Sequence, residues 1–143
     1  MRATLLDTGP VVGLLHQGDA HHDSTIEAMK ASVAAGRGLA CTWEVVGEAF
    51  TLIRLRIAKP GRPTPAFTVL QWAEDGGATV EAAMDFDQRR AAEILRGHAD
   101  VRLSYVDALV LAISERLGVE ELLTVDAHLG AVRLARELIV TVV

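Results

Sequence analysis

The stretch Ala-Thr-Leu-Leu-Asp-Thr-Gly-Pro at residues 3–10 decides the fold. Its first four residues form a short apolar run, which predicts a buried strand, and Asp7 ends that run. The Thr-Gly-Pro that follows predicts a helix start, because proline is accepted in the first helical turn. We therefore expect a helix over residues 9–16. A strand that leads directly into a helix is the first half of the β–α–β unit from which parallel sheets are built.

The same alternation continues to the end of the chain. Apolar and β-branched runs predict strands at 39–42, 78–80 and 121–125, and an edge strand at 138–143. The spacing of apolar residues, with Gly and Pro as stop signals, predicts helices at 23–35, 43–59, 63–73, 86–96 and 104–117. This alternation indicates right-handed crossovers with helices on both faces of a sheet. We expect an α/β fold, a three-layer α/β/α sandwich with a central, mainly parallel sheet.

Length and composition indicate a single globular domain. A chain of 143 residues is large enough for one core, so we assign residues 1–143 to one domain. Half of the residues are apolar, which excludes disorder, and no apolar run is long enough to span a membrane. Asp7, Gly9 and Pro10 interrupt the apolar amino terminus, which is unlike a signal peptide. The single cysteine, Cys41, permits no internal disulfide, and we expect a cytoplasmic protein.

Three aspartates stand at the ends of the apolar segments. Asp7 follows the strand expected at 3–6, Asp126 falls at the end of the strand expected at 121–125, and Asp107 opens the apolar helix that runs to Leu117. Ligands of a parallel sheet bind beyond the carboxyl ends of its strands, so these acids can converge. Carboxylates without a basic partner are ligands for a hard divalent cation. The placement predicts metal-assisted phosphate chemistry.

Each of these aspartates also has a purely structural interpretation. Acidic side chains accept hydrogen bonds from free amides at helix starts, so Asp7 and Asp126 are candidate caps of the segments that follow them. Ser104 and Asp107 match a capping box. Taken singly, each acid is better explained as a cap. Their joint placement favours a site.

Two glutamates one helical turn apart are candidates for a fourth acid. At 100° per residue, Glu48 lies at the border of the apolar stripe of the helix at 43–59, whereas Glu44 lies further toward solvent. Glu44 is explained as a favourable charge in the first helical turn. We therefore predict Glu48 as the fourth member of the site.

The net charge of −5 argues at first against nucleic acid as a partner, because phosphate binding needs basic residues. If the four acids are ligands, 15 acids face 14 bases on the rest of the chain, which is nearly neutral. A nucleic-acid partner therefore remains open. Basic side chains concentrate near two helices, where most have a simpler explanation as solvated charges: Arg54, Arg56, Lys59, Arg62, Arg89, Arg90, Arg96 and Arg102.

Several motifs together resemble those of PIN-domain nucleases, in particular VapC-like toxins of bacterial toxin–antitoxin pairs. The matching stretches, which cover nearly the whole chain in order, are Leu-Leu-Asp-Thr-Gly-Pro-Val-Val-Gly-Leu-Leu at 5–15, Asp-Ala-His-His at 19–22, Cys-Thr-Trp-Glu-Val-Val-Gly-Glu-Ala-Phe-Thr-Leu-Ile-Arg at 41–54, Leu-Ser-Tyr-Val-Asp-Ala-Leu-Val-Leu-Ala-Ile at 103–113 and Leu-Leu-Thr-Val-Asp-Ala-His-Leu at 122–129. Gly13 and Leu129 depart from the family pattern, which has alanine and an aromatic residue there. Both departures concern packing.

The resemblance implies a PIN fold and four catalytic, metal-binding acids at Asp7, Glu48, Asp107 and Asp126. Thr8 and Ser104 match the hydroxyl residues that accompany the first and third acids. It also implies an endoribonuclease that depends on Mg²⁺ or Mn²⁺ and leaves a 5′-phosphate, a homodimer, and a cognate antitoxin that blocks the site.

Other functions would require different residues at these positions. A phosphatase with a strand-end aspartate usually needs a second acid two residues on, where this chain has Gly9. A phosphoacceptor signalling domain needs an acidic pair at the end of the first strand, which this chain also lacks. The alternative from another class is a PIN-like module that binds RNA or protein without cleaving. The adjacent histidines His21 and His22 point about 100° apart and have no evident third ligand, so we predict surface or structural roles for them. His128, next to Asp126, is a candidate substrate contact.

Overall fold

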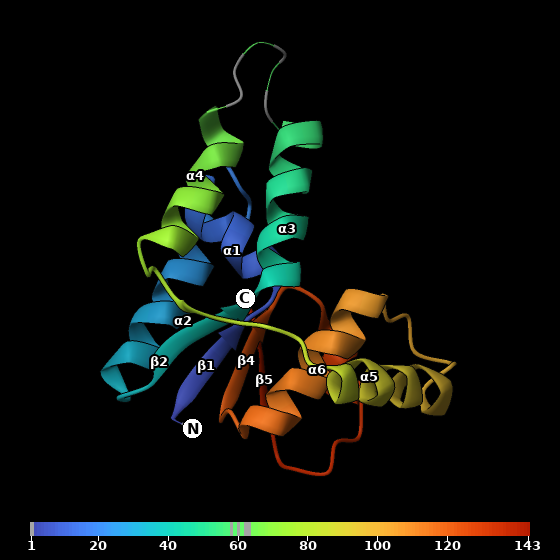
Figure 1. Ribbon diagram of the computed structural model, residues 1–143. Helices are drawn as coiled ribbons and strands as arrows, with labels where there is room; N and C mark the ends of the chain where they lie inside the picture. Colours follow the sequence, from blue (N-terminus) through green and yellow to red (C-terminus); the bar gives the residue numbers. More distant parts are fainter. Residues whose placement is uncertain (1, 58, 60, 62–63) are drawn as a thin grey trace.

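The computed structural model describes residues 2–57, 59, 61 and 64–143, which form a five-stranded sheet covered by helices (Figure 1). All strand pairings in this sheet are parallel, in the order β3-β2-β1-β4-β5. The strands are β1 (Ala3–Leu6), β2 (Gly38–Thr42), β3 (Thr79–Glu81), β4 (Glu121–Thr124) and β5 (Ile139–Val142). The predicted α/β fold is confirmed, with β5 at the edge of the sheet as expected.

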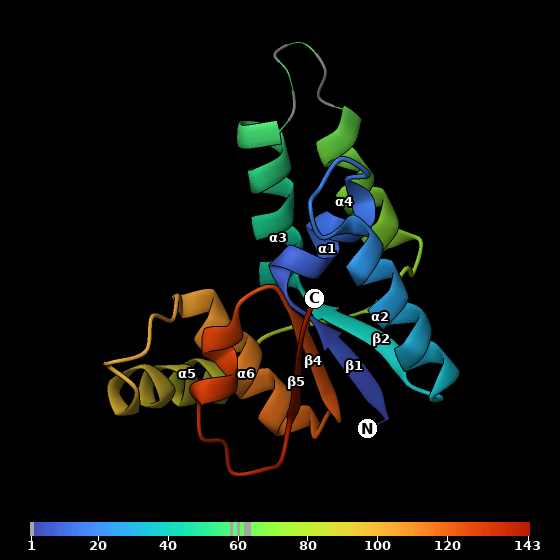
Figure 2. The ribbon, with the colours of Figure 1, turned by 180° about the vertical axis from the view of Figure 1, so that it is seen from behind.

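In the described residues, six α-helices connect these strands: α1 (Thr8–Leu15), α2 (His22–Ala34), α3 (Trp43–Leu52), α4 (Thr64–Glu74), α5 (Asp85–Gly97) and α6 (Tyr105–Leu117). Figures 1 and 2 show α1 to α4 grouped together, with α5 and α6 on the other side of the sheet. This is the three-layer arrangement that right-handed crossovers impose when the chain reverses its direction across the sheet. No helix in the described part of the chain is long and apolar enough to cross a membrane.

The third helix ends earlier than its apolar pattern predicts. Its α-helical part stops at Leu52, and π-helical turns continue over Ile53–Ile57. The helix predicted at 43–59 therefore starts at the predicted residue, but it is not α-helical over its whole length. The helix start predicted at Pro63 and the basic residue Arg62 lie outside the described residues.

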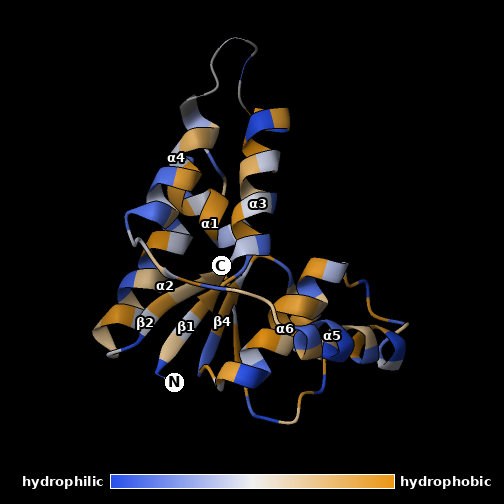
Figure 3. Cartoon of the chain, viewed as in Figure 1, coloured by the Kyte–Doolittle hydropathy of each residue, from blue (hydrophilic) through white to orange (hydrophobic). Residues whose placement is uncertain are grey.

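Among the described helices, α6 has the longest unbroken run of buried residues. All residues from 108 to 114 are buried, and Figure 3 shows α6 largely in hydrophobic colours where α5 is largely hydrophilic. The start of α6 is fixed by the predicted capping box, in which the Ser104 hydroxyl accepts from the amide of Asp107 at 3.0 Å. Its end is fixed by Gly118 in the left-handed conformation (φ 61°), which glycine adopts without strain. Asp107 is therefore held on a rigid, buried helix.

The remaining predictions about packing also hold. Cys41 and Leu129 are buried core residues, so the departure at Leu129 concerns packing, as predicted. At the other departure, a Cβ atom added to Gly13 would lie 2.8 Å from the Thr25 hydroxyl. Alanine at this position would therefore require the Thr25 side chain to shift, which favours the glycine.

Candidate functional site

The main candidate site lies at the carboxyl ends of the two central strands. From β1 the chain crosses to β2 on one side, and it later returns to β4 on the other, so the order of the strands reverses between β1 and β4. Crevices at such reversal points are where open parallel sheets bind ligands. A pocket of about 310 Å³, here called the acid pocket, lies at this point. It is lined by Asp7, Thr8, Gly9, Val12, Asp19, His21, Glu48, Leu52, Asp107, Val125 and Asp126.

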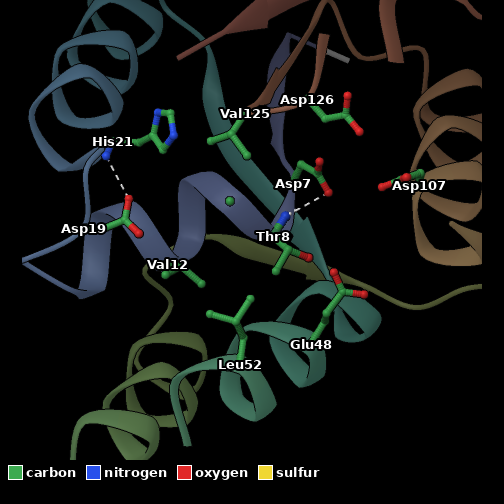
Figure 4. A pocket seen from close by; sticks show the side chains of 11 residues that line it. Asp7, Thr8, Val12, Asp19, His21, Glu48, Leu52, Asp107, Val125 and Asp126 are labelled. Atoms are coloured by element: carbon green, nitrogen blue, oxygen red, sulfur yellow. Dashed lines mark hydrogen bonds between the residues drawn. The ribbon is translucent and has the colours of Figure 1, made fainter. Parts of the chain in front are cut away.

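All four acids predicted from the sequence line the acid pocket, and each comes from a different segment. Asp7 precedes α1, Glu48 lies on α3, Asp107 is in the first turn of α6, and Asp126 precedes a short 3₁₀ helix at Ala127–Ala131. Figure 4 shows their carboxylates around one end of the pocket. Residues separated by more than a hundred positions in the sequence thus share one site.

Asp7 is the most buried of the four acids, with 5% of its surface exposed. One carboxylate oxygen accepts from the amide of Thr8 at 2.8 Å, and the other accepts from the hydroxyl of Thr124 at 2.7 Å. The amide of Asp7 donates to the carbonyl of Leu123 at 3.0 Å. These contacts tie the ends of β1 and β4 together and fix the Asp7 side chain at the floor of the pocket.

The environment of Asp7 raises its pKa from 3.8 to about 6. The main cause is burial, which disfavours the charged carboxylate. The hydrogen bonds from Thr124 and Thr8 lower the pKa, and the negative charges of Asp107 and Glu48 raise it again. The sensitivity of Asp7 to both neighbours indicates that the three carboxylates are electrostatically coupled. A cation in the pocket would relieve this repulsion.

This pKa shift predicts how the stability of the metal-free protein depends on pH. The folded state holds the Asp7 proton more tightly than the unfolded state, so stability is lost as the pH rises from 3.8 to about 6. The shift corresponds to a loss of up to about 3 kcal/mol. In the presence of EDTA, the free energy of unfolding measured in urea should therefore fall over this pH range in the wild type. It should fall less in Asp7→Asn, whose side chain at position 7 cannot ionise. Parallel pH profiles of the two proteins would contradict the assignment.

Asp107 and Asp126 serve as helix caps and pocket residues at the same time. Asp107 accepts from the amide of Ser104 through Oδ2 at 2.8 Å, and Asp126 accepts from the amide of His128 through Oδ1 at 2.8 Å. Within the described residues, the second oxygen of each carboxylate has no hydrogen-bond partner. The cap interpretation is therefore correct for both residues, and each keeps one carboxylate oxygen without a hydrogen bond beside the pocket. The imidazole Nδ1 of His128 lies 3.0 Å from Asp126 Oδ1, beside the pocket.

The two glutamates of α3 differ from the expectation in their exposure. Glu48 is exposed and lines the acid pocket, whereas Glu44 is half-buried. One oxygen of Glu44 is shielded from solvent and has no hydrogen-bond partner in the described part of the chain. The helical wheel placed Glu44 further toward solvent, which is wrong. A wheel considers only one helix, and here Val106 of α6 lines the same surface groove as both glutamates.

The donor chemistry of the acid pocket suits a hard divalent cation. Carboxylate oxygens predominate, and the buried hydroxyl of Thr8 has no hydrogen-bond partner among the described residues. No three acidic, histidine or cysteine side chains of the described residues lie close enough together to hold a metal ion on their own. Mg²⁺ usually keeps several waters and takes one or two carboxylates from the protein, so this looser arrangement fits it.

Two pocket residues were missed by the sequence interpretation. Asp19 and His21 line the acid pocket, although a surface or structural role was predicted for His21. Helix α1 is only eight residues long, so the loop after it turns back over the pocket. The short helix and the Asp-Ala-His-His match at 19–22 are the sequence signals that would have placed them. The structural role predicted for His22 is supported, because its ring contacts the carbonyl of Gly13 at 2.7 Å. The ring of His98 contacts the carbonyl of Ile94 in the same way, at 2.9 Å.

Some of the basic residues contact other side chains, and others have no ion-pair partner among the described residues. Arg90 forms ion pairs with Glu115 at 2.8 Å and with Glu93 at 3.2 Å, which the sequence analysis did not predict. The Arg54 guanidinium lies 5.7 Å from the centre of the Phe67 ring. Arg89 and Arg96 line a separate groove on α5 and have no ion-pair partner in the described chain. The basic residues of the described part of the chain therefore do not line the acid pocket itself.

Comparison with known proteins identifies the fold. No protein-family model matches the chain, and no curated protein matches its sequence. VapC20 from Mycobacterium tuberculosis, a sarcin–ricin loop cleaving toxin, has a TM-score of 0.76 at 21% identity and covers 90% of this chain and 94% of its own. VapBC-5 from the same organism, a member of the VapBC family of toxin–antitoxin systems, has a TM-score of 0.64 at 17% identity over 100% of both chains. VapBC2 from Rickettsia felis, bound to a promoter DNA fragment, has a TM-score of 0.69 at 13% identity over 97% of both chains. The chain has the VapC-like PIN-domain toxin fold, as its motifs predicted.

Proposed function

We propose that the protein is a metal-dependent endoribonuclease that cleaves RNA phosphodiester bonds and acts as the toxin of a toxin–antitoxin pair. The observation that carries the proposal is the convergence of four acidic side chains from four segments in one pocket, at the point where the strand order reverses. The VapC-like fold supports the same chemistry, since one similar protein is a sarcin–ricin loop cleaving toxin.

Asp7 and Asp107 are the proposed direct ligands of Mg²⁺ or Mn²⁺. Asp7 is positioned by two hydrogen bonds and Asp107 by a capping box, so both carboxylates are held before a cation arrives. Glu48 and Asp126 complete the site, either through water or at a second ion. When bound, the cation lowers the pKa of a water and offsets negative charge on the phosphate.

The side chains of the pocket have separate tasks in the proposed hydrolysis. Glu48, which is exposed at the pocket rim, and Asp126 orient the attacking water in line with the leaving oxygen. The Thr8 hydroxyl, which is buried and unpaired among the described residues, is available to a phosphate oxygen or a water. Hydrolysis by this route breaks the bond to the 3′ oxygen and leaves a 5′-phosphate on the downstream fragment.

The proposed partners are an RNA substrate, a second copy of the chain, and an antitoxin that blocks the site. Similar structures of VapBC systems support the antitoxin. A short reading frame for a DNA-binding antitoxin is therefore expected beside this gene. Its absence, together with failure of the purified proteins to associate, would argue against the toxin role without affecting the cleavage chemistry.

The enzymatic proposal is tested by incubating the purified protein with total RNA in Mg²⁺, Mn²⁺ or EDTA. We expect cleavage with either metal ion, fragments with 5′-phosphate ends, and none above background in EDTA. Restoration by excess Mg²⁺ after EDTA is the control for irreversible loss. Cleavage that persists in EDTA would contradict the carboxylate mechanism. No cleavage under any condition would instead favour a PIN-like module that binds RNA or protein without cutting it.

A further inference from the structure

The acid pocket has a second end that the proposed hydrolysis does not use. Figure 4 shows Asp7, Glu48, Asp107 and Asp126 around one end and Asp19 with His21 at the other. Between them the walls are formed by Val12, Leu52 and Val125. An apolar section is unfavourable for a charged phosphate, whereas the planar base of a nucleotide can pack against apolar side chains. The two ends thus match the two parts of one nucleotide.

We propose that this second end binds the base of the nucleotide next to the cleaved phosphate, and that the preferred base is guanine. The inference rests on the proposed ribonuclease function and adds a determinant of its specificity. Proteins read single-stranded RNA by placing unstacked bases against apolar or aromatic side chains and by hydrogen bonds to the base edges. The volume of about 310 Å³ is at the low end of small-ligand sites, which suits one nucleotide.

The apolar walls are held rigidly in place. Val12 is buried on α1, and Val125 is packed against the first turn of the same helix. A Cβ atom added to Gly9 would lie 2.5 Å from Val125, so only glycine permits this close approach. Gly9, which stands where a phosphatase would have its second acid, therefore shapes the wall of the pocket. A wall in which the Val125 side chain packs against Gly9 suits a flat ligand.

Asp19 and His21 supply the polar groups that would read the base. Oδ1 of Asp19 accepts from the amide of His21 at 2.8 Å, which fixes both residues in one tight turn. Among the described residues, the other oxygen of Asp19 and the ring nitrogens of His21 have no partner. They face the pocket with free hydrogen-bonding capacity (Figure 4).

The pairing chemistry favours guanine over the other bases. Guanine offers two adjacent N–H donors, at N1 and N2, beside the acceptor O6. The free oxygen of Asp19 can accept from one donor and the second lone pair of Oδ1 from the other, while a ring N–H of His21 donates to O6. Uracil offers one such donor, and adenine lacks an acceptor oxygen. We expect a preference for guanosine of about tenfold or more at one position beside the cut.

Cleavage of a randomised RNA pool, followed by sequencing of the fragment ends, tests this inference. Asp19→Asn retains an oxygen for the His21 amide but replaces the second acceptor with a donor, so guanosine preference should fall by about tenfold. His21→Ala should weaken it as well. The matched controls are Asp23→Asn and His16→Ala, which change nearby residues that do not line the pocket. Both controls should keep the wild-type base profile, and all four variants should keep the wild-type melting temperature.

Two results would overturn the inference while leaving the ribonuclease proposal intact. One is cleavage by the wild type without base preference, and the other is an unchanged profile in both Asp19→Asn and His21→Ala. If the wild type does not cleave at all, the ribonuclease proposal fails. Binding then decides the question: NMR signals of the His21 ring should shift with guanosine 5′-monophosphate more than with uridine 5′-monophosphate, and less in Asp19→Asn. Equal shifts for both nucleotides would refute the guanine site.

Discussion

Replacing Asp107 with asparagine should lower RNA cleavage by more than about 100-fold while the protein stays folded. The loss of a group that only supports a metal ligand typically costs about 10- to 100-fold, so the loss of a direct ligand should cost more. Asparagine keeps an oxygen that can accept from the amide of Ser104, so the start of α6 is preserved. The measurement is the single-turnover cleavage rate in saturating Mg²⁺, together with the melting temperature.

The control for this substitution is Asp23→Asn. Asp23 is also an aspartate in the first turn of a helix, but it is exposed and lies outside the acid pocket. It should retain the wild-type rate. If Asp107→Asn cleaves as fast as Asp23→Asn, Asp107 is a helix cap and nothing more. That result would leave Asp7 without the partner that the mechanism assigns to it.

Asp87→Ala should produce the largest loss of stability among single acidic substitutions, about 3 kcal/mol. Asp87 is 1% exposed and binds the Nε atom of Arg116 with both carboxylate oxygens, at 2.9 and 3.0 Å. It also accepts from the amide of Met84 at 2.8 Å, at the start of α5. Its removal leaves the Arg116 charge largely buried without its carboxylate. The free energy of unfolding in urea measures the effect.

Asp85→Ala is the matched control for the stability prediction. Asp85 lies in the same first turn of α5 but is exposed, so its loss should cost less than about 1 kcal/mol through the helix dipole. Equal destabilisation by the two substitutions would show that the Asp87–Arg116 pair contributes nothing beyond its charge at the helix end. RNA cleavage at low temperature should survive Asp87→Ala, since neither residue of the pair lines the acid pocket.

The sequence predicted most of the fold because local signals and the tertiary structure agree here. The strand at Ala3–Leu6 was predicted with its exact bounds, and Pro10 falls in the first turn of the helix that follows. The capping box at Ser104 and the αL glycine at 118 fix α6 by contacts within a few residues. Predictions were weaker where the backbone changes its hydrogen-bonding pattern, as in the π-helical turns after Leu52.

The candidate site was predictable only in part. The placement of Asp7 and Asp126 follows from strand ends and a parallel sheet, which are sequence-level arguments. The relative burial of Glu44 and Glu48 was predicted wrongly, because a neighbouring helix covers this side of α3. The ion pair of Arg90 could not be predicted either, because its partner Glu115 lies 25 positions away on another helix.

By itself, the sequence determined the alternation of strands and helices, the caps, and the four acids that those elements carry. These features depend on contacts between residues close together in the chain, so one sequence is enough to read them. The tertiary structure alone decided that Asp19 and His21 face the same pocket as the acids, and that valine and leucine side chains separate the two groups. Such neighbourhoods arise from packing between distant segments, where direction and distance are set by the whole fold.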